Sequence, residues 1–351
     1  MRIGIISPVE IRIPPVGYGG IELVVSILTE ELVSRGNDVT LFASGDSVTS
    51  ARLVSVVPEY LRKSNTDPRF FSYKNMIECF EREEEFDIIH NHLMGEGLLA
   101  AGLVKTPTLT TLHGPISGKD ILAFKYYKGW YNTISKSALN LLTRKEKYSG
   151  VVYNAIDCSR YAFNGGARDD YLLYLSRFSP EKGAHIAIQV ARRLNRRLIL
   201  AGNLADEEYF KDKILPFVDG KNIVCEIEVD DDRKKSLLSN ASCLLAPILW
   251  DEPFGLFMVE ALACGTPVVA FNRGAAPELI QDQKTGFVVE NIEQMVDSVK
   301  KIDYIDPRKC RQHVLKNFDT PVMAANYLDA YRRVLTSTKK LDTAPEILLK
   351  N

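Results

Sequence analysis

The chain has 351 residues and a mass of 39.4 kDa, a length that predicts about two domains. Its 44 basic and 45 acidic residues almost cancel, which argues against nucleic acid as a partner, because binding a phosphate backbone needs a clustered positive excess. Hydrophobic residues at 46% and charged residues at 25% match a folded globular protein and exclude extended disorder.

Short β-branched runs alternate with helical patterns along the first half of the chain. Apolar residues at helical spacing predict a helix over Gly20–Ser34 that ends at Gly36. Strands are predicted at Ile3–Ser7, Val39–Ala43, Asp87–His90, Thr108–His113, Thr133–Ser135 and Val151–Asn154. This alternation is typical of a mostly parallel sheet that is covered on both faces.

A second series of the same kind begins near residue 171. Strands are predicted at Tyr171–Ser176, Arg197–Ala201, Ile223–Ile227, Cys243–Ala246 and Val268–Phe271, and helices at Ala184–Leu194, Arg233–Leu238, Leu256–Ala263 and Pro321–Leu335. The polar stretch Asp157–Asp170 is expected to link the two series. The predicted fold class is α/β, with two doubly wound domains whose ligands bind at the carboxyl ends of the strands, in a cleft.

Cellular location is inferred from the cysteines and from the apolar segments. The six cysteines are scattered and form no C-x-x-C pair, so they predict neither a zinc ribbon nor a disulfide framework, and they suit a reducing compartment. Met1–Ser7 is too short for a signal peptide. The apolar run Pro253–Asn272 contains Glu260 and Gly265-Thr266-Pro267, so we interpret it as a helix, a turn and a strand rather than a membrane span. We expect a cytoplasmic protein.

Glycines follow the first predicted strand and open its helix, at Gly17, Gly19 and Gly20. Glycines let backbone amides approach a ligand, and a helix N-terminus favours anions. Their spacing differs from the G-x-G-x-x-G pattern of dinucleotide-binding proteins, so a nicotinamide cofactor is not indicated. On this motif alone, a ligand-binding loop and a plain turn both remain open.

Two cations and two carboxylates stand out in the second half. Arg177 follows a predicted strand and Lys182 lies beside a helix start, a pair suited to a diphosphate, although two solvated surface charges are the alternative. Glu252 precedes an apolar helix and Glu260 lies inside it, where a buried carboxylate needs a partner such as ribose hydroxyls. The alternative is that Glu252 caps the helix and that Glu260 pairs with an arginine in the core. The nearby helix start offers the backbone amides of Phe254, Gly255 and Leu256 to phosphate or sugar oxygens.

These motifs together resemble glycosyltransferase family 4, whose members have the GT-B fold. The glycine loop, the Arg177/Lys182 pair and the E-x7-E string that runs on into Ala-x-Ala-Cys-Gly-Thr-Pro-Val-Val carry the likeness, with support from Asn154–Asp157. The resemblance spans nearly the whole chain. It implies two Rossmann-like domains facing a cleft: residues 1–160 for the acceptor and 161–320 for the nucleotide sugar, with residues 321–351 packing back on the first domain.

The resemblance also implies a reaction. A hexose, with glucose or mannose as the expected sugars, would pass with retention from a nucleotide sugar, UDP-glucose being the leading choice, to an acceptor without metal or cofactor. Arg177 and Lys182 would stabilise the leaving diphosphate, since fixed cations act best where negative charge develops. Glu252 would bind the donor sugar and Glu260 the ribose. Further donor contacts are expected from Gly19, Gly20, Phe254, Gly255, Leu256 and, near the base, Val229, although the family usually has Gly where Ile227 stands.

Histidines are the remaining candidates for chemistry. His113 ends a predicted strand, where the family has a histidine near the reacting sugar; a structural role is the alternative. His90 and His92 are expected at the acceptor pocket rather than on a metal, because no further ligands are evident. Aromatic residues in the loops 60–80 and 115–130 either stack on the acceptor or pack in the core: Phe70, Phe71, Tyr126, Tyr127 and Trp130.

Two charged runs receive ordinary structural interpretations. Asp230–Asp232 contains D-x-D, but it precedes a helix, where acidic side chains cap. Lys136–Lys147 is interpreted as a solvated amphipathic helix rather than a membrane contact. The expected partners are a nucleotide sugar and a small-molecule, sugar or lipid-linked acceptor, with the oligomeric state unassigned. A nucleotide-sugar epimerase and a non-catalytic nucleotide-sugar sensor are the alternative functions; the string around Glu252 argues against the first, and the four charged site residues together argue against the second.

Overall fold

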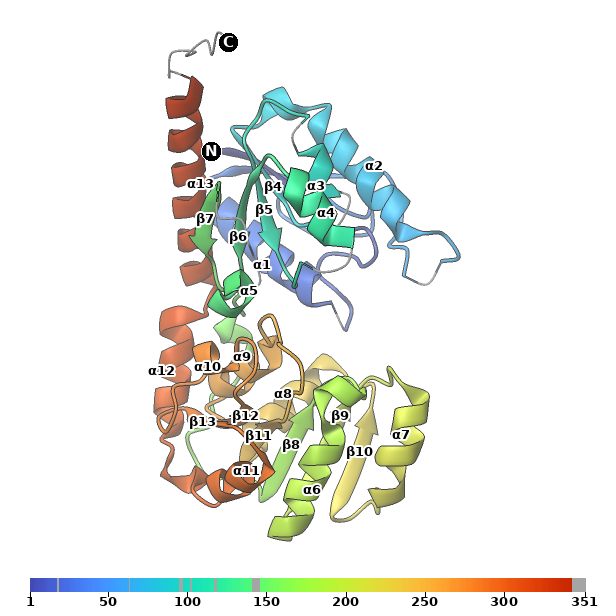
Figure 1. The fold of residues 1–351 in the computed structure, drawn as a ribbon, viewed down its shortest axis with the longest axis vertical. Helices are drawn as coiled ribbons and strands as arrows, with labels where there is room; N and C mark the ends of the chain where they lie inside the picture. Colours follow the sequence, from blue (N-terminus) through green and yellow to red (C-terminus); the bar gives the residue numbers. More distant parts are fainter. Residues whose placement is uncertain are drawn as a thin grey trace, which may run out of the picture. The chain divides into compact units, whose positions relative to one another are not determined.

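The chain folds into two compact units. The computed structural model describes residues 1–17, 19–62, 64–94, 97–101, 103–116, 119–140 and 146–342. Unit 1 contains residues 1–134, 139–152 and those from 323 onward, and unit 2 contains residues 135–138 and 153–322. Each unit is built on one parallel sheet with helices around it (Figure 1).

The sheet of unit 1 has seven parallel strands in the order β3-β2-β1-β4-β5-β6-β7. Strands buried on both faces need apolar side chains at nearly every position, and β1 meets this with Ile3, Ile5 and Ile6 fully buried. The strand order reverses between β1 and β4, which is where ligands bind in doubly wound sheets. The strands are β1 (Arg2–Ile6), β2 (Asp38–Phe42), β3 (Arg52–Val54), β4 (Ile88–Asn91), β5 (Thr108–Leu112), β6 (Trp130–Thr133) and β7 (Tyr148–Val151).

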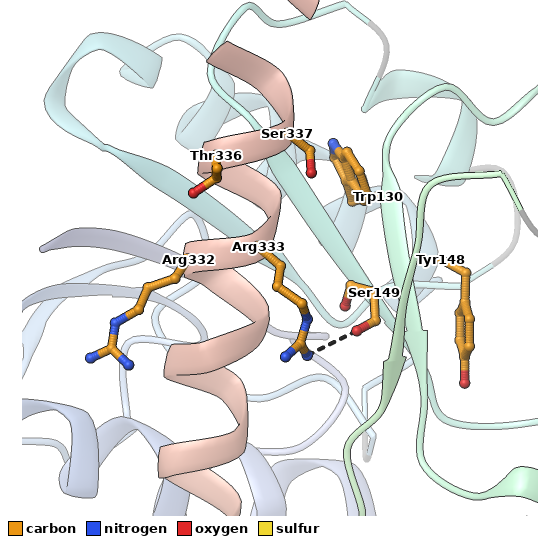
Figure 2. A pocket seen from close by; sticks show the side chains of 7 residues that line it. All are labelled: Trp130, Tyr148, Ser149, Arg332, Arg333, Thr336 and Ser337. Atoms are coloured by element: carbon orange, nitrogen blue, oxygen red, sulfur yellow. Dashed lines mark hydrogen bonds between the residues drawn. The ribbon is translucent and has the colours of Figure 1, made fainter. Parts of the chain in front are cut away.

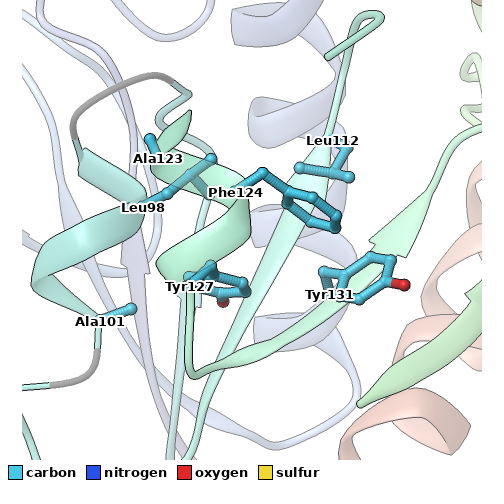
Figure 3. Packing of buried hydrophobic residues seen from close by; sticks show 7 residues of the cluster. All are labelled: Leu98, Ala101, Leu112, Ala123, Phe124, Tyr127 and Tyr131. Carbon is cyan, nitrogen blue, oxygen red and sulfur yellow. The ribbon is translucent and has the colours of Figure 1, made fainter. Parts of the chain in front are cut away.

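Helices cover this sheet through apolar side chains. One buried cluster joins helices α3 and α4 to strands β5 and β6, with Phe124 edge-on to Tyr131 and Leu98 and Leu112 alongside (Figure 3). A second cluster packs Met76 and Cys79 of α2 against Ile6 of β1. The helices before residue 153 are α1 (Gly20–Ser34), α2 (Pro68–Phe80), α3 (Gly97–Ala100), α4 (Lys119–Tyr126) and α5 (Lys136–Asn140), of which α5 begins in unit 2.

The long helix α13 (Thr320–Asp342) returns to unit 1. Its Tyr327 hydroxyl lies 3.0 Å from Thr111 Oγ1 of β5, and its Tyr331 hydroxyl lies 2.7 Å from His90 Nδ1 of β4. Arg333 donates to the backbone oxygen of Ser149 in β7, the strand that runs beside α13 (Figure 1). Hydrogen bonds between buried groups are specific in geometry, so they fix the position of α13 on this sheet.

The sheet of unit 2 has six parallel strands in the order β10-β9-β8-β11-β12-β13, with the reversal between β8 and β11. The strands are β8 (Tyr171–Leu175), β9 (Arg197–Gly202), β10 (Ile223–Ile227), β11 (Cys243–Ala246), β12 (Val268–Phe271) and β13 (Gly286–Val289). The helices are α6 (Ala184–Leu194), α7 (Glu207–Lys213), α8 (Asp231–Asn240), α9 (Leu256–Ala263), α10 (Ala276–Leu279), α11 (Ile292–Val299) and α12 (Pro307–Asn317). The predicted α/β class with two Rossmann-like domains is therefore confirmed.

Several predicted boundaries differ from the structure. The strands expected at Thr133–Ser135 and Val151–Asn154 begin three residues earlier, as β6 and β7. For β7 the reason is that Tyr148-Ser149-Gly150 carries little apolar signal for an edge strand. The stretch Asp157–Asp170, expected as a linker, packs on unit 2: Asn164 donates to the backbone of Ser239 and Arg168 to that of Gly265. Of the run Lys136–Lys147, residues 141–145 lie outside the described part, as do 343–351 of the C-terminal tail.

Candidate functional site

The loops after β8 and β11 meet at the strand-order reversal of unit 2. Lys182 ends a short 3-10 helix, Pro180–Lys182, that follows β8, and Glu252 lies in the loop after β11. Lys182 Nζ is hydrogen-bonded to Glu252 Oε2, and the two side chains are only 7% and 13% exposed. The predicted phosphate-binding cation and the predicted sugar-binding carboxylate are therefore brought together as a buried ion pair.

Two glycines allow these loops to approach so closely. Gly183 has φ +75°, and a Cβ there would lie 2.0 Å from the backbone oxygen of Pro247 in the β11 loop. Gly274, with φ +53°, brings the loop after β12 against Glu252, where a Cβ would lie 2.3 Å from the backbone nitrogen. Leu249 N also donates to the backbone oxygen of Glu181, at 2.8 Å. Any side chain at Gly183 or Gly274 would push these loops apart.

Trp250 and Arg177 complete the surroundings of the ion pair. Trp250 Nε1 donates to Glu252 Oε2 at 2.9 Å, and Lys182 Nζ lies 5.0 Å from the centre of a Trp250 ring. The ring thus provides a cation–π contact to the ammonium group. Arg177 follows β8 with its guanidinium 3.7 Å from Glu181 and its side chain partly exposed. Sequence reasoning missed Trp250, although it stands two residues before Glu252.

The start of α9 presents unpaired backbone donors. Helix α9 begins at Leu256, directly after Gly255, and has eight residues. Across the described ranges, no hydrogen bond is donated by the backbone N–H groups of Phe254, Gly255 or Leu256. Free amides at the positive end of a helix are suited to phosphate or carboxylate oxygens. The prediction that these amides are open to a ligand remains compatible with this geometry.

Glu260 lies inside α9 and is only 4% exposed. Its Oε1 accepts a hydrogen bond of 2.8 Å from the Tyr161 hydroxyl and one of 3.1 Å from Lys234 Nζ. Burial opposes the charged form of Lys234, but Glu260 and Asp231 outweigh this effect and leave the Lys234 pKa raised. Within the described residues no hydrogen bond reaches Glu260 Oε2. Tyr161 and Lys234 were not predicted; a lysine in the run after Asp232 was the available signal.

The predicted base contact lies beyond β10. Ile227 ends that strand with an exposed side chain, and Glu228 follows with φ +55° while its N–H donates to the backbone oxygen of Gly202. Val229 is half-buried in the same turn. The turn precedes α8, which Asp230 caps by accepting from the Arg233 N–H at 2.7 Å. The capping role predicted for the Asp230–Asp232 run is therefore confirmed.

In unit 1 the glycine loop leads into α1. Gly20 is the first residue of that helix and Gly19 precedes it, with the Pro15 side chain so near that a Cβ on Gly19 would lie 2.7 Å from it. Glu22 of α1 is buried, and burial raises the pKa of its carboxyl group. Tyr18, between the glycines, lies outside the described residues.

His90 is enclosed by protein groups. Its Nε2 lies 2.7 Å from Thr111 Oγ1 and its Nδ1 lies 2.7 Å from the Tyr331 hydroxyl of α13. Both ring nitrogens are thus occupied, and burial lowers the pKa of His90 to about 3. This geometry gives His90 a structural role under α13 and leaves no nitrogen for the acceptor contact that we predicted.

His92 and His113 form a pair at the ends of β4 and β5. His92 Nδ1 lies 2.8 Å from His113 Nε2, and the two rings are stacked with centres 5.1 Å apart. Burial lowers the pKa of His113 to about 4, and burial together with the neighbouring histidines holds the pKa of His92 well below its ordinary value. Both rings are therefore neutral near pH 7. No group of metal-binding side chains of three or more members occurs among the residues that the structure describes.

The five predicted acceptor aromatics lie in different environments, and Phe71 is half-buried. Tyr127 is buried, and its hydroxyl donates to the Trp130 backbone oxygen and lies 2.7 Å from Thr110 Oγ1, so it packs in the core. Phe70 and Tyr126 are exposed. Trp130 lines a cavity of about 400 Å³ beside α13, where Figure 2 shows Arg333 pointing to Ser149.

None of the described helices is long and apolar enough to span a bilayer.

Comparisons with known proteins agree with this arrangement. Residues 162–313 match the model of the glycosyl transferases group 1, and residues 18–160 match that of Glycosyltransferase Family 4. A putative glycosyltransferase of Bacillus subtilis, YtcC, is 23% identical over 100% of this chain and 96% of its own. The phosphatidyl-myo-inositol mannosyltransferase of Mycobacterium leprae is 23% identical over 98% and 100%. The crystal structure of AviGT4, a glycosyltransferase involved in avilamycin A biosynthesis, superimposes with a TM-score of 0.74 at 25% identity, covering 96% of this chain and 98% of that one.

Proposed function

The chain belongs to glycosyltransferase family 4, and from this premise we propose that it transfers a hexose from a nucleotide sugar, with UDP-glucose as the leading donor, to an acceptor with retention at the anomeric carbon. Unit 2 binds the donor through the loops after β8 and β11 and the start of α9. Unit 1 binds the acceptor through the loops after β1, β4 and β5.

The observation that carries this proposal is the meeting of Lys182, Glu252 and the free amides of α9 at the strand-order reversal of unit 2. Breaking the bond between sugar and diphosphate leaves negative charge on the phosphate oxygens. A lysine ammonium and helix N-terminal amides that are fixed before the reaction stabilise this charge as it develops. Arg177, placed after β8, adds a second cation, so the leaving group needs no metal ion.

The two carboxylates have separate tasks in this proposal. Glu260 is held rigidly by Tyr161 and Lys234, and its Oε2 remains to accept hydrogen bonds from the ribose hydroxyls. Glu252 accepts from Lys182 and Trp250 through Oε2, so its other oxygen can receive a hydroxyl of the donor sugar. Carboxylates are strong acceptors for paired hydroxyls because each oxygen carries two lone pairs.

Thermal stabilisation by a panel of nucleotide sugars tests the proposal directly. A ligand that binds only the native state raises Tm, and at a concentration 100 times its Kd it adds about 2.7 kcal/mol. We expect UDP and UDP-glucose to stabilise the protein more than nucleotide-free glucose 1-phosphate. Retention is then checked by the anomeric configuration of the product. Release of an epimer without acceptor, or binding without turnover, would contradict the proposed transfer and favour an epimerase or a sensor respectively.

A further inference from the structure

Two unpaired polar atoms lie directly after the strands β1 and β4, which flank the strand-order reversal of unit 1. The β1–β4 register pairs Ile6 with Asn91, so the next residues, Ser7 and His92, are neighbours on one face of the sheet. Their side chains are 0% and 1% exposed. Within the described residues, Ser7 Oγ and His92 Nε2 have no hydrogen-bond partner. Leaving buried polar groups unpaired is costly, so such groups at a ligand-binding edge point to a polar ligand.

His92 is connected to a third free atom through His113. The 2.8 Å contact between His92 Nδ1 and His113 Nε2 is a hydrogen bond in which only one of the two nitrogens carries the proton. His113 Nδ1 makes no hydrogen bond to any described residue. The pair therefore has two nitrogens in the shared bond and two that have no hydrogen-bond partner among the described residues.

The shared proton couples the two open nitrogens. A neutral imidazole carries one proton, so if His92 Nδ1 donates, His92 Nε2 is an acceptor and His113 Nδ1 is a donor. If His113 Nε2 donates instead, both roles are exchanged. In either state the pair offers one donor and one acceptor, which is the combination that a sugar hydroxyl or a pair of adjacent hydroxyls requires.

We propose that the two unpaired nitrogens of the His92–His113 pair, with Ser7 Oγ, bind hydroxyl groups of the sugar substrate, and that His92 also holds His113 in one tautomer. This inference rests on the proposed function. His90 supports the arrangement from below: its ring centre lies 4.0 Å from that of His92, and its own nitrogens are held by Thr111 and Tyr331. The ring of His92 is thus held by a tilted ring contact with His90 on one side and by the hydrogen bond to His113 on the other.

Nuclear magnetic resonance of the protein labelled with 15N-histidine tests the coupling without any substrate. At pH 7.5 we expect neutral rings, one tautomer for each of His92 and His113, and a scalar coupling between 15N nuclei across their hydrogen bond. Signals are assigned from His92→Asn and His113→Asn variants. A wild-type spectrum in which both rings are assigned and the coupling is absent would overturn the proposal.

The variants separate positioning from packing. His92→Phe keeps a ring in the stack but removes both nitrogens, so His113 is expected to relax toward the tautomer mixture of free imidazole. His92→Asn places an amide near the Nδ1 position and is expected to restore a single His113 tautomer. Matching far-UV circular dichroism shows that each variant is folded. A single unchanged tautomer of His113 in folded His92→Phe would speak against the inference.

Kinetics with UDP-glucose, scored as transfer or as donor hydrolysis, supplies the functional readout. His92→Phe is expected to lower kcat about tenfold or more, as for other residues that orient a functional group, with KM for the donor within about twofold and with partial rescue in His92→Asn. Ser7→Ala should raise KM for the hydroxyl-bearing substrate without changing the His113 tautomer. If the wild type shows the 15N–15N coupling but no transfer or hydrolysis activity, only the proposed function is contradicted. If the wild type is active and His92→Phe has the same kcat, only this inference is contradicted.

Discussion

Lys182 and Glu252 form a buried ion pair across 70 residues of sequence. Both charges are compensated while both groups stay at the strand-order reversal of unit 2, and Trp250 contacts both. Two charges removed from water are tolerated only with such good partners. The pair therefore keeps a cation dehydrated and fixed in place, as charge stabilisation in a reaction requires.

Replacing Lys182 by alanine should abolish most of the transfer activity while the fold survives. Loss of one fixed donor to a developing anion costs about 100-fold to 1,000-fold in kcat. Steady-state kinetics with UDP-glucose measures this change. Lys211→Ala, which removes an exposed lysine paired with Glu207, is the matched control and should behave as wild type. Near-wild-type turnover in Lys182→Ala would refute the role given to Lys182.

The Glu260→Gln variant should bind UDP more weakly. It replaces the carboxylate that is proposed to accept ribose hydroxyls and also leaves Lys234 without its buried counter-charge. A hydrogen bond to a charged group contributes about 1.5–3 kcal/mol, so Kd should rise roughly tenfold or more. Isothermal titration calorimetry with UDP gives the value, with Glu207→Gln on an exposed surface as control. An unchanged Kd would show that Glu260 does not bind the ribose of UDP.

Gly183→Ala and Gly220→Ala should differ strongly in stability. Both glycines have positive φ, at +75° and +71°, so the backbone strain of alanine is similar in the two variants. At Gly183 the new Cβ would lie 2.0 Å from the Pro247 oxygen, whereas at Gly220 nothing lies within 4 Å. Chemical denaturation should therefore show a loss for Gly183→Ala that exceeds that for Gly220→Ala by about 1–3 kcal/mol. Equal losses of stability in the two variants would show that the loop after β11 moves to accommodate the new methyl group.

The tyrosines of α13 should stabilise unit 1 through their hydroxyl groups. Tyr327→Phe and Tyr331→Phe leave Thr111 and His90 with one partner fewer, and each should lower the free energy of unfolding by about 1–2 kcal/mol. Denaturant titrations measure the effect. Tyr304→Phe serves as control, because Tyr304 is 87% exposed and should change little. If neither Tyr327→Phe nor Tyr331→Phe lowers the free energy of unfolding, apolar packing alone positions α13.

Stability should fall as the pH drops below about 6.5. The folded protein excludes protons from His90 and His113, with pKa values lowered by burial to about 3 and about 4, whereas the unfolded chain binds them near 6.5. The unfolded state thus gains protons first between pH 6.5 and 4, and each histidine costs roughly 1.4 kcal/mol per pH unit there. Above 6.5 these rings contribute no slope. Thermal unfolding measured from pH 7.5 to 5 should show stability falling with pH, and His90→Phe should lose less stability per pH unit than the wild type. If both proteins lose stability at the same rate, the pH dependence comes from other groups.

Much of this site could be predicted from local sequence, because strand ends and helix starts are local features. The positions of Lys182 after β8 and of Glu252 and Glu260 around the start of α9 follow from apolar runs and glycines. The partners could not be predicted in the same way. Lys234 and Tyr161 reach Glu260 only through tertiary packing, and the two nitrogens of His90 are occupied by groups 21 and 241 residues away.

Unit 1 is built from segments at both ends of the chain, which has a consequence for the order of folding during synthesis. Its sheet is complete in sequence at Val151, but Tyr327 and Tyr331, which cover Thr111 and His90, are translated only after the whole of residues 153–322. When the ribosome has synthesised only residues 1–152, the side chains of Thr111 and His90 are not yet covered by α13 and remain accessible to water. The first unit to be translated is therefore the last to be finished.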